Sequence, residues 1–362
     1  MKILAVLLPA LLFPLHRNLA EEKKLEEVAA FPDQQVTGVG VSLKSGRVFV
    51  NFPYWSPDHS VSVAEIVDGK PLAFPDASWN SKEGDAAKRF VCVQSVVVDD
   101  EDRLWVLDTG SPMQKGVVKG GAKVLQVDLS TNKVRRTYPI DEECAPEKSY
   151  LNDIRIDTAG GHAFITESGI GSIVVLDLKS GKARRFLANH PSTKAETGKE
   201  IVVDGIKPID PATAGTPSFH ADGIAFDRKN KLLYYHPLTG HTLYRISTDV
   251  LASPDSGDKE VEEAVVKVAA TDAPDGMLET ADGAVLLAAF EKNAIVRFDP
   301  HGKKSSPVIE DTRLQWPDTL AWGPEGWLYV TTSQIHRTPK YNGGKSLIKE
   351  PFRVYRLKAG NP

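Results

Sequence analysis

Amide and carboxylate side chains recur at one position of a repeated strand pattern. They are Gln94, Asn152, Asp153, Asp222, Asp275 and Asp318, and each stands at the start of a short apolar segment. A ring of such oxygen atoms suits a hard cation such as Ca²⁺ or Mg²⁺, or the amine of a small ligand. Crowded carboxylates also push their pKa values apart and can supply a general base. Asp153, Asp222 and Asp275 are therefore candidate catalytic residues.

A local turn is the alternative role for these residues. Asp and Asn before a strand form Asx turns, and Asp-Gly, as at Asp222 and Asp275, is a common turn dipeptide. For any one residue the turn role is the better prediction. For the set we favour a site, because the position repeats while the loops around it vary.

Aromatic residues precede two members of this set. Phe219 and His220 stand just before Asp222, and Trp316 stands just before Pro317 and Asp318. Aromatic walls over a polar floor suit a flat, amine-bearing or catechol-like ligand. His220 is a candidate proton shuttle near neutral pH, with a structural hydrogen bond as its alternative role. The predicted ligand-binding residues are Gln94, Asn152, Phe219, Trp316 and Asp318.

The elements that must position these residues are short strands with period-2 apolarity and turn residues between them. The third unit is the clearest copy, with strands expected at residues 152–157, 162–167, 172–178 and 183–187. Six such units follow one another, and taking Phe49 and Tyr329 as equivalent gives a mean repeat of about 56 residues. Four-stranded units repeated radially are typical of a propeller. We predict an all-β fold: a six-bladed β-propeller with four-stranded antiparallel blades, as a single domain over residues 36–362.

Three long segments between the strands mark one face of this propeller. They are residues 51–80, 189–219 and 334–350. Loops of this length in a compact domain often serve as lids or binding surfaces. Peripheral decoration is the alternative role.

The bulk properties exclude some partners. The chain has 362 residues, of which 41% are hydrophobic and 25% charged, so it can bury a large core. Its formal net charge of −4 gives no reason to expect nucleic acid or an anionic membrane as a partner. We expect a monomer that binds a small molecule.

The N-terminal segment has the pattern of a secretory signal peptide. Lys2 is followed by an apolar run over residues 3–15, which is shorter than the roughly 20 residues that span a bilayer. We expect a signal peptide at residues 1–20, a short helix or loose leader at 21–35, and a secreted or periplasmic protein without a membrane segment after cleavage. An uncleaved anchor is the alternative.

Two cysteines, Cys92 and Cys144, are present. In an exported chain they are compatible with one disulfide bridge, and two buried free thiols are the alternative. No Cys/His cluster indicates zinc.

Longer motifs resemble the yellow/major royal jelly protein family. They are Arg-Leu-Trp-Val-Leu-Asp-Thr-Gly at residues 103–110, Leu-Tyr-Tyr-His-Pro-Leu-Thr at 233–239, Phe-His-Ala-Asp-Gly-Ile-Ala at 219–225 and Phe-Pro-Asp-Ala-Ser-Trp-Asn at 74–80. The similarity spans about residues 36–358, and the few cysteines are typical of a bacterial member. The resemblance implies a secreted six-bladed propeller, small amines bound in the channel mouth and, in some members, dopachrome conversion.

More distantly, the chain is similar to gluconolactonase/regucalcin-like propellers, which hold a divalent metal with channel Asn, Asp and Glu side chains. That resemblance implies metal ligands at Asn152, Asp222 and Asp275. The chain departs from the pattern in the first blade, where Thr37 and Gly38 stand in place of a Glu.

Together these observations predict a channel-mouth site for a small amine, catechol or similar ligand. If the protein is an enzyme, we expect isomerase-type proton transfer of the dopachrome-tautomerase kind, with His220, Asp153, Asp222 or Asp275 as base. A metal-dependent lactone hydrolase using Ca²⁺ is the second hypothesis. A non-enzymatic binding protein is the third.

Overall fold

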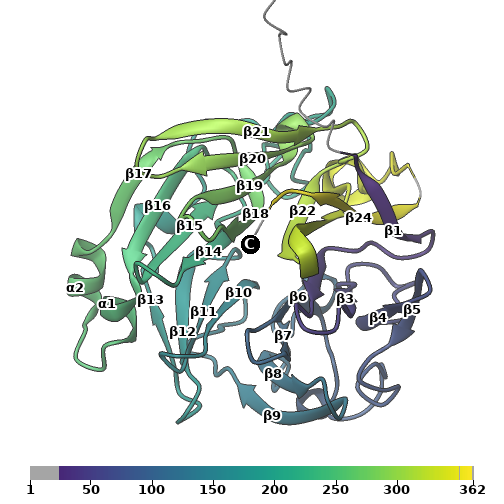
Figure 1. Ribbon diagram of the computed structural model, residues 1–362, viewed down its shortest axis with the longest axis horizontal. Helices are drawn as coiled ribbons and strands as arrows, with labels where there is room; N and C mark the ends of the chain where they lie inside the picture. The colour runs from purple at the N-terminus through teal and green to yellow at the C-terminus, as the bar shows by residue number, and fades with distance from the viewer. Residues whose placement is uncertain (1–23, 350, 361–362) are drawn as a thin grey trace, which may run out of the picture.

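In the computed structural model, which describes residues 24–349 and 351–360, twenty-four strands form six four-stranded antiparallel sheets around a central axis (Figure 1). The predicted all-β, six-bladed propeller is confirmed. The proposed signal peptide at residues 1–20 lies outside the described residues. No helix within the described ranges is long and apolar enough to cross a membrane.

The first three blades follow one another in sequence order. They consist of β2 (Gly38–Val41), β3 (Val48–Asn51), β4 (Val63–Val67) and β5 (Lys70–Ala73); β6 (Val93–Val98), β7 (Arg103–Asp108), β8 (Lys123–Asp128) and β9 (Lys133–Pro139); and β10 (Leu151–Asp157), β11 (His162–Glu167), β12 (Ser172–Asp177) and β13 (Ala183–Phe186).

Blades four and five continue the order, and blade six takes its fourth strand from the N-terminal region. They consist of β14 (Ala221–Asp227), β15 (Leu232–Pro237), β16 (Thr242–Ser247) and β17 (Val266–Ala270); β18 (Pro274–Glu279), β19 (Val285–Ala289), β20 (Ala294–Asp299) and β21 (Lys304–Glu310); and β22 (Pro317–Trp322), β23 (Trp327–Thr332), β24 (Phe352–Lys358) and β1 (Glu26–Phe31). Two short helices, α1 (Thr248–Ala252) and α2 (Asp258–Glu263), lie between β16 and β17.

Strand β1 corrects the prediction for residues 21–35. The segment was expected as a helix or loose leader, but residues 26–31 pair antiparallel with β24 and form the outer edge of blade six. Phe31 and Ala29 are buried in the core between blades six and one, and this burial stabilises an extended segment over an isolated helix. The propeller therefore begins before residue 36 and is closed by strands from both ends of the chain.

The hydrophobic core lies between neighbouring blades. Along β7, Leu104 and Val106 pack against blade one, whereas Trp105 and Leu107 pack against blade three. This alternation follows from the period of two along a strand that is buried on both faces. Every adjacent pair of blades has such a cluster, so each blade is held by two neighbours.

Bulges at the start of the inner strands distinguish blades two to six from blade one. The register with the second strand shifts at Gln94, Asn152, Asp222, Asp275 and Asp318, while β2 pairs with β3 without a shift. A bulge residue leaves the regular ladder and re-aims its side chain. These five residues therefore lie within strands and not in the Asx or Asp-Gly turns that were their alternative role.

Close packing around the channel explains the glycines beside two of these residues. A Cβ atom at Gly223 would lie 2.4 Å from the carbonyl oxygen of Asp275, and one at Gly276 would lie 2.3 Å from that of Asp318. Such contacts are too short for any side chain. The inner strands of blades four to six approach each other this closely only because glycine follows the bulge.

Candidate functional site

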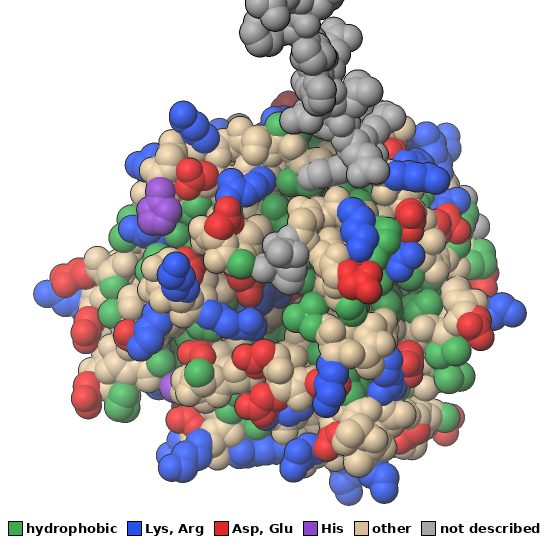
Figure 2. Space-filling model, in the orientation of Figure 1, with side chains coloured by type: hydrophobic (Ala, Val, Ile, Leu, Met, Phe, Trp, Pro, Cys, Tyr) green, Lys and Arg blue, Asp and Glu red, His purple; other side chains and the backbone are tan. Residues whose placement is uncertain are grey.

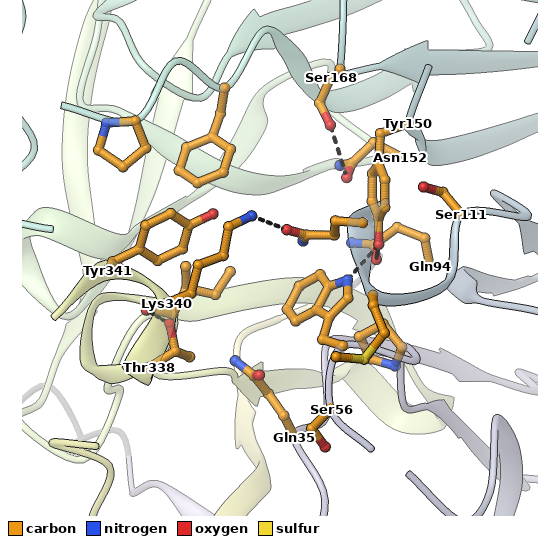
Figure 3. A pocket seen from close by; sticks show the side chains of 18 of the residues that line it. Gln35, Ser56, Gln94, Ser111, Tyr150, Asn152, Ser168, Thr338, Lys340 and Tyr341 are labelled. Atoms are coloured by element: carbon orange, nitrogen blue, oxygen red, sulfur yellow. Dashed lines mark hydrogen bonds between the residues drawn. The ribbon is translucent and has the colours of Figure 1, made fainter. Parts of the chain in front are cut away.

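A cavity of about 830 Å³ lies at one mouth of the central channel. All three long segments singled out in the sequence contribute to its wall, through Trp55, Phe219 and Tyr341 among others. Figure 3 shows Tyr341 and Lys340 on one side of the cavity, facing Tyr150, Asn152 and Gln94 on the other. All three segments therefore line one cavity at the channel mouth.

Five polar bulge residues line the floor of this cavity. They are Gln94, Asn152, Asp222, Asp275 and Asp318, one from each of blades two to six. Each side chain is almost fully withdrawn from solvent. The structure thus brings together at one level the set that the repeat pattern picked out, whereas Asp153 is not among the lining residues.

Burial and mutual repulsion raise the proton affinity of the floor carboxyls. Burial is the largest cause, and it raises the pKa of Asp222 and of Asp318 well above the usual range, with nearby Asp275 as the next cause for both. Burial also raises the pKa of Asp275 to about 7. Asp275 can therefore gain or lose a proton near neutral pH, while burial favours the neutral forms of Asp222 and Asp318.

Hydrogen bonds fix two of these carboxyls. Asn152 Nδ2 donates to Asp222 Oδ1 at 2.7 Å, and Trp316 Nε1 donates to Asp275 Oδ2 at 2.6 Å. The indole N–H favours the charged form of Asp275 and so limits the rise of its pKa.

Deeper in the channel, Asp153 belongs to a different environment. Its carboxylate oxygen lies 4.0 Å from a guanidinium nitrogen of Arg155, which donates to the carbonyl oxygens of Ile154 and, across the channel, of Met277. Burial raises the pKa of Asp153, and Arg155 opposes that rise. Asp153 is therefore paired with an arginine that links two inner strands, and it does not line the cavity where a ligand would bind.

Trp316 was predicted as a ligand-binding wall, and the structure corrects this. Its side chain is fully buried, stacked between Phe290, with centroids 4.3 Å apart, and His336, with centroids 5.6 Å apart. Trp316 has a φ of 58°, and this left-handed conformation precedes Pro317 at the entry to β22. The ring supports Asp275 from behind and does not line the cavity.

His220 is likewise displaced from its predicted catalytic role. Its Nδ1 accepts a hydrogen bond from the backbone N–H of Ala195 at 2.9 Å, and the residue is not among those lining the cavity. Burial lowers the pKa of His220 to about 4. A neutral imidazole thus holds the 189–219 segment in place. Phe219 does line the cavity, with an edge contact to Tyr341 at 5.8 Å.

The predicted bridge between Cys92 and Cys144 is not formed, and the alternative of two buried free thiols holds. The Cys92 thiol lies 3.8 Å from Tyr150 Oη near the cavity, whereas Cys144 packs in the core between blades two and three. The two side chains therefore belong to different surroundings. Burial raises the pKa of each to about 12, so both thiols stay protonated.

A hydrogen-bonded group of Trp55, Tyr150 and Gln94 was missed by the sequence reasoning. Trp55 Nε1 donates to Tyr150 Oη at 2.6 Å, and Tyr150 Oη donates to Gln94 Oε1 at 2.9 Å. Burial raises the pKa of Tyr150 well above its usual value, so the phenol keeps its proton. Tyr150 stands two residues before Asn152, as Trp316 stands two before Asp318, and that equivalence could have identified it.

The predicted metal ligands Asn152, Asp222 and Asp275 do not fit a divalent cation. Asn152 turns an N–H donor, and not an oxygen, toward Asp222. Across residues 24–349 and 351–360, no group of three or more His, Cys, Asp or Glu side chains converges closely enough to hold a metal ion. Calcium needs several ionised or carbonyl oxygens converging on one point.

The fold and the cavity define a class: six-bladed propellers with a polar pocket at the channel mouth. Within this class, the family profile of the major royal jelly proteins matches residues 91–357. The chain belongs to this family.

Individual relatives are distant. The chain is 26% identical to Protein yellow of Drosophila pseudoobscura pseudoobscura over 231 residues, which covers 60% of this chain and 41% of that protein. The matched part thus spans about two fifths of the length of this relative.

Two solved structures share the fold. Regucalcin of Agrobacterium tumefaciens, described as calcium-binding, has a TM-score of 0.56 at 13% identity and covers 94% of this chain and 96% of its own. A gluconolactonase of Xanthomonas campestris has a TM-score of 0.54 at 11% identity and covers 94% of this chain and 91% of its own. At these identities the similarity concerns the fold alone.

Proposed function

We propose that this chain is an exported binding protein, of bacterial type, that takes a small aromatic amine, catechol or related ring compound into the channel mouth and isomerises it by proton transfer. It acts as a monomer after removal of residues 1–20. The observation that carries the proposal is a titratable carboxyl, Asp275, with a pKa of about 7 on the floor of an aromatic-walled cavity. Family membership supports the same assignment.

The cavity suits a flat ligand better than an extended polymer. Phe219, Trp55 and Tyr341 supply ring faces and edges for stacking, and the polar floor lies beneath them. On the face shown in Figure 2, Lys and Arg side chains are interspersed with Asp and Glu. Such a surface has no extended area of one sign to attract a polyanion.

The isomerisation needs only the carboxyls of the floor. Ionised Asp275 removes a proton from a ring carbon next to a carbonyl or imine group, and the electron pair moves into the conjugated system. Protonated Asp222 returns a proton at a second atom of the ring, so the substrate keeps its composition and oxidation state. Because burial separates the proton affinities of the two groups, one serves as base while the other serves as acid.

A dopachrome decay assay tests this assignment. We expect Asp275→Asn and Asp222→Asn to lower kcat by about 100-fold or more, which is the usual contribution of a positioned acid or base. His220→Ala is the comparison variant, since its ring bonds Ala195 and neither residue lines the cavity, and kcat should stay within about threefold. Wild-type rates in both Asp variants contradict the assignment, and Ca²⁺-dependent lactone hydrolysis would instead favour the metal-dependent hydrolase.

A further inference from the structure

We propose that Gln94 selects the chemical class of the ligand: its amide N–H₂ group faces the cavity and binds molecules that present a carbonyl or quinone oxygen. The inference deepens the proposed function and rests on it for the cavity being the binding site. It does not depend on catalysis.

The order of hydrogen bonds around Tyr150 determines how the Gln94 amide is turned. An indole nitrogen can only donate, so Tyr150 Oη must accept from Trp55 Nε1 at 2.6 Å. The phenol proton then remains for the neighbour at 2.9 Å, which must be the oxygen of the Gln94 amide. Because this oxygen is committed to Tyr150, the two amide N–H donors are left for another partner.

The opposite orientation of the Gln94 amide would leave the phenol proton of Tyr150 without a good hydrogen-bond acceptor. If Gln94 turned its nitrogen toward the phenol, the phenol proton would have only Cys92 Sγ, at 3.8 Å, as a nearby acceptor. Sulfur is a weak acceptor, and a buried O–H group that loses a good partner is destabilised. The protonated thiol of Cys92 is better placed to donate to Tyr150, which agrees with the first orientation.

Among the described residues, the Gln94 side chain is hydrogen-bonded through its oxygen, its amide nitrogen has no acceptor, and the residue is 8% exposed and lines the cavity. Its position at the bulge of β6 aims it toward the channel axis. Figure 3 shows Gln94 beside Tyr150 on the side of the cavity opposite Tyr341. A ligand that fills the cavity without offering an acceptor would leave this donor unpaired.

This arrangement predicts discrimination between ligands of equal shape. A site built to pair a polar group rejects an analogue lacking the partner far more strongly than an apolar pocket rejects a change of size. Quinones, cyclic ketones and similar carbonyl compounds can accept from Gln94, whereas an aromatic amine in the same place presents N–H groups to it. Within the range of ligands proposed above, the predicted substrate class is therefore a flat ring bearing a carbonyl or quinone oxygen, and simple aromatic amines are the weaker ligands.

Calorimetric titration with two probes on one skeleton tests the inference: 1-indanone, which offers a carbonyl oxygen, and 4-aminoindane, which offers a neutral aromatic amine. We expect the wild-type protein to bind 1-indanone about tenfold more tightly, or better, which corresponds to one hydrogen bond. Gln94→Met keeps a side chain of similar length but removes both N–H donors, so the ratio of the two affinities should fall toward one. Gln126→Met is the matched control, because Gln126 lies on β8 and is not among the residues that line the cavity, and the ratio should not change.

Two further variants test Tyr150 and Trp55 as positioning residues. Tyr150→Phe and Trp55→Phe remove the bonds that fix the amide, so the ratio of the two affinities should fall toward one. A merely structural role would weaken both probes equally and leave the ratio unchanged. Equal binding of both probes by the wild-type protein, or an unchanged ratio in Gln94→Met, overturns the inference. Binding of neither probe contradicts the proposed function as well, whereas loss of dopachrome conversion alone leaves the selectivity of Gln94 intact.

Discussion

Replacing Trp316 with phenylalanine should raise the pKa of Asp275. The change keeps a ring between Phe290 and His336 but removes the N–H group that donates to Asp275 Oδ2 at 2.6 Å. A hydrogen bond to a charged group contributes about 1.5–3 kcal/mol. Since one pKa unit corresponds to about 1.4 kcal/mol, the loss should raise the pKa of Asp275 by about one to two units, from about 7 to about 8 or 9.

This shift can be measured through stability without any ligand. The ordinary pKa of an Asp carboxyl, 3.8, applies to the unfolded chain, so between this value and about 7 folded Asp275 binds more protons than unfolded Asp275. The contribution of Asp275 to the free energy of unfolding is therefore full below pH 4, falls as the pH rises, and levels off above about 7. In Trp316→Phe the fall should continue to about pH 8 or 9.

Urea unfolding at pH 5, 7 and 9 measures the effect. The difference in free energy of unfolding between pH 7 and 9 should be larger in Trp316→Phe than in the wild-type protein by about 1–2 kcal/mol. Trp322→Phe is the matched control, because its indole donates to the backbone carbonyl of Glu279 and to no titrating group. A pH dependence of Trp316→Phe that parallels those of the wild-type protein and Trp322→Phe would refute the role of the indole.

Three other perturbations test separate parts of the structure. Lys123→Met should lower the free energy of unfolding by about 3–5 kcal/mol in urea titrations, because Lys123 Nζ lies 2.7 Å from buried Asp108 and loss of the ammonium group leaves the Asp108 carboxylate unpaired. A decrease of less than about 1 kcal/mol would contradict this. Thr166→Val should lower the free energy of unfolding by about 1–3 kcal/mol in the same assay, because the Thr166 hydroxyl accepts from Asp153 N of blade three and donates to Asp222 O of blade four. The equivalent Thr331→Val should lower it as much, and stability unaffected by both changes would refute the inter-blade role. Chelation with EDTA followed by Ca²⁺ addition should leave the Tm unchanged in thermal-shift measurements, because the floor does not fit a divalent cation; a Ca²⁺-dependent rise in Tm would reinstate a metal site.

The sequence predicted the propeller because each blade repeats one local pattern. Alternating apolar residues followed by turn residues specify strands and hairpins, and this pattern recurs along the chain from Phe49 to Tyr329. Strand β1 could not be predicted in the same way. Its sequence, residues 26–31, begins with two Glu residues and becomes a strand only through pairing with β24, more than three hundred residues away.

The floor of the site was predictable because equivalent positions in a repeat occupy equivalent places. Asp222, Asp275 and Asp318 therefore met at one level, as the pattern indicated. The roles of the residues just before them were not predictable, since they depend on single torsion angles and loop contacts. Trp316 enters its strand with a left-handed φ and does not line the cavity, and His220 is held by Ala195 of a long insertion.

The central claim is that the channel mouth is the ligand site and that its carboxyl floor contacts the ligand. Thermal-shift screening against amines, catechols and carbonyl compounds, followed by calorimetry of the tightest binder, measures this directly. We predict that Asp275→Asn weakens that ligand by about tenfold or more, while Asp282→Asn, at an exposed turn bonded to Thr280 and Arg297, leaves its affinity unchanged. Equal affinity of the wild-type protein and Asp275→Asn would contradict the claim.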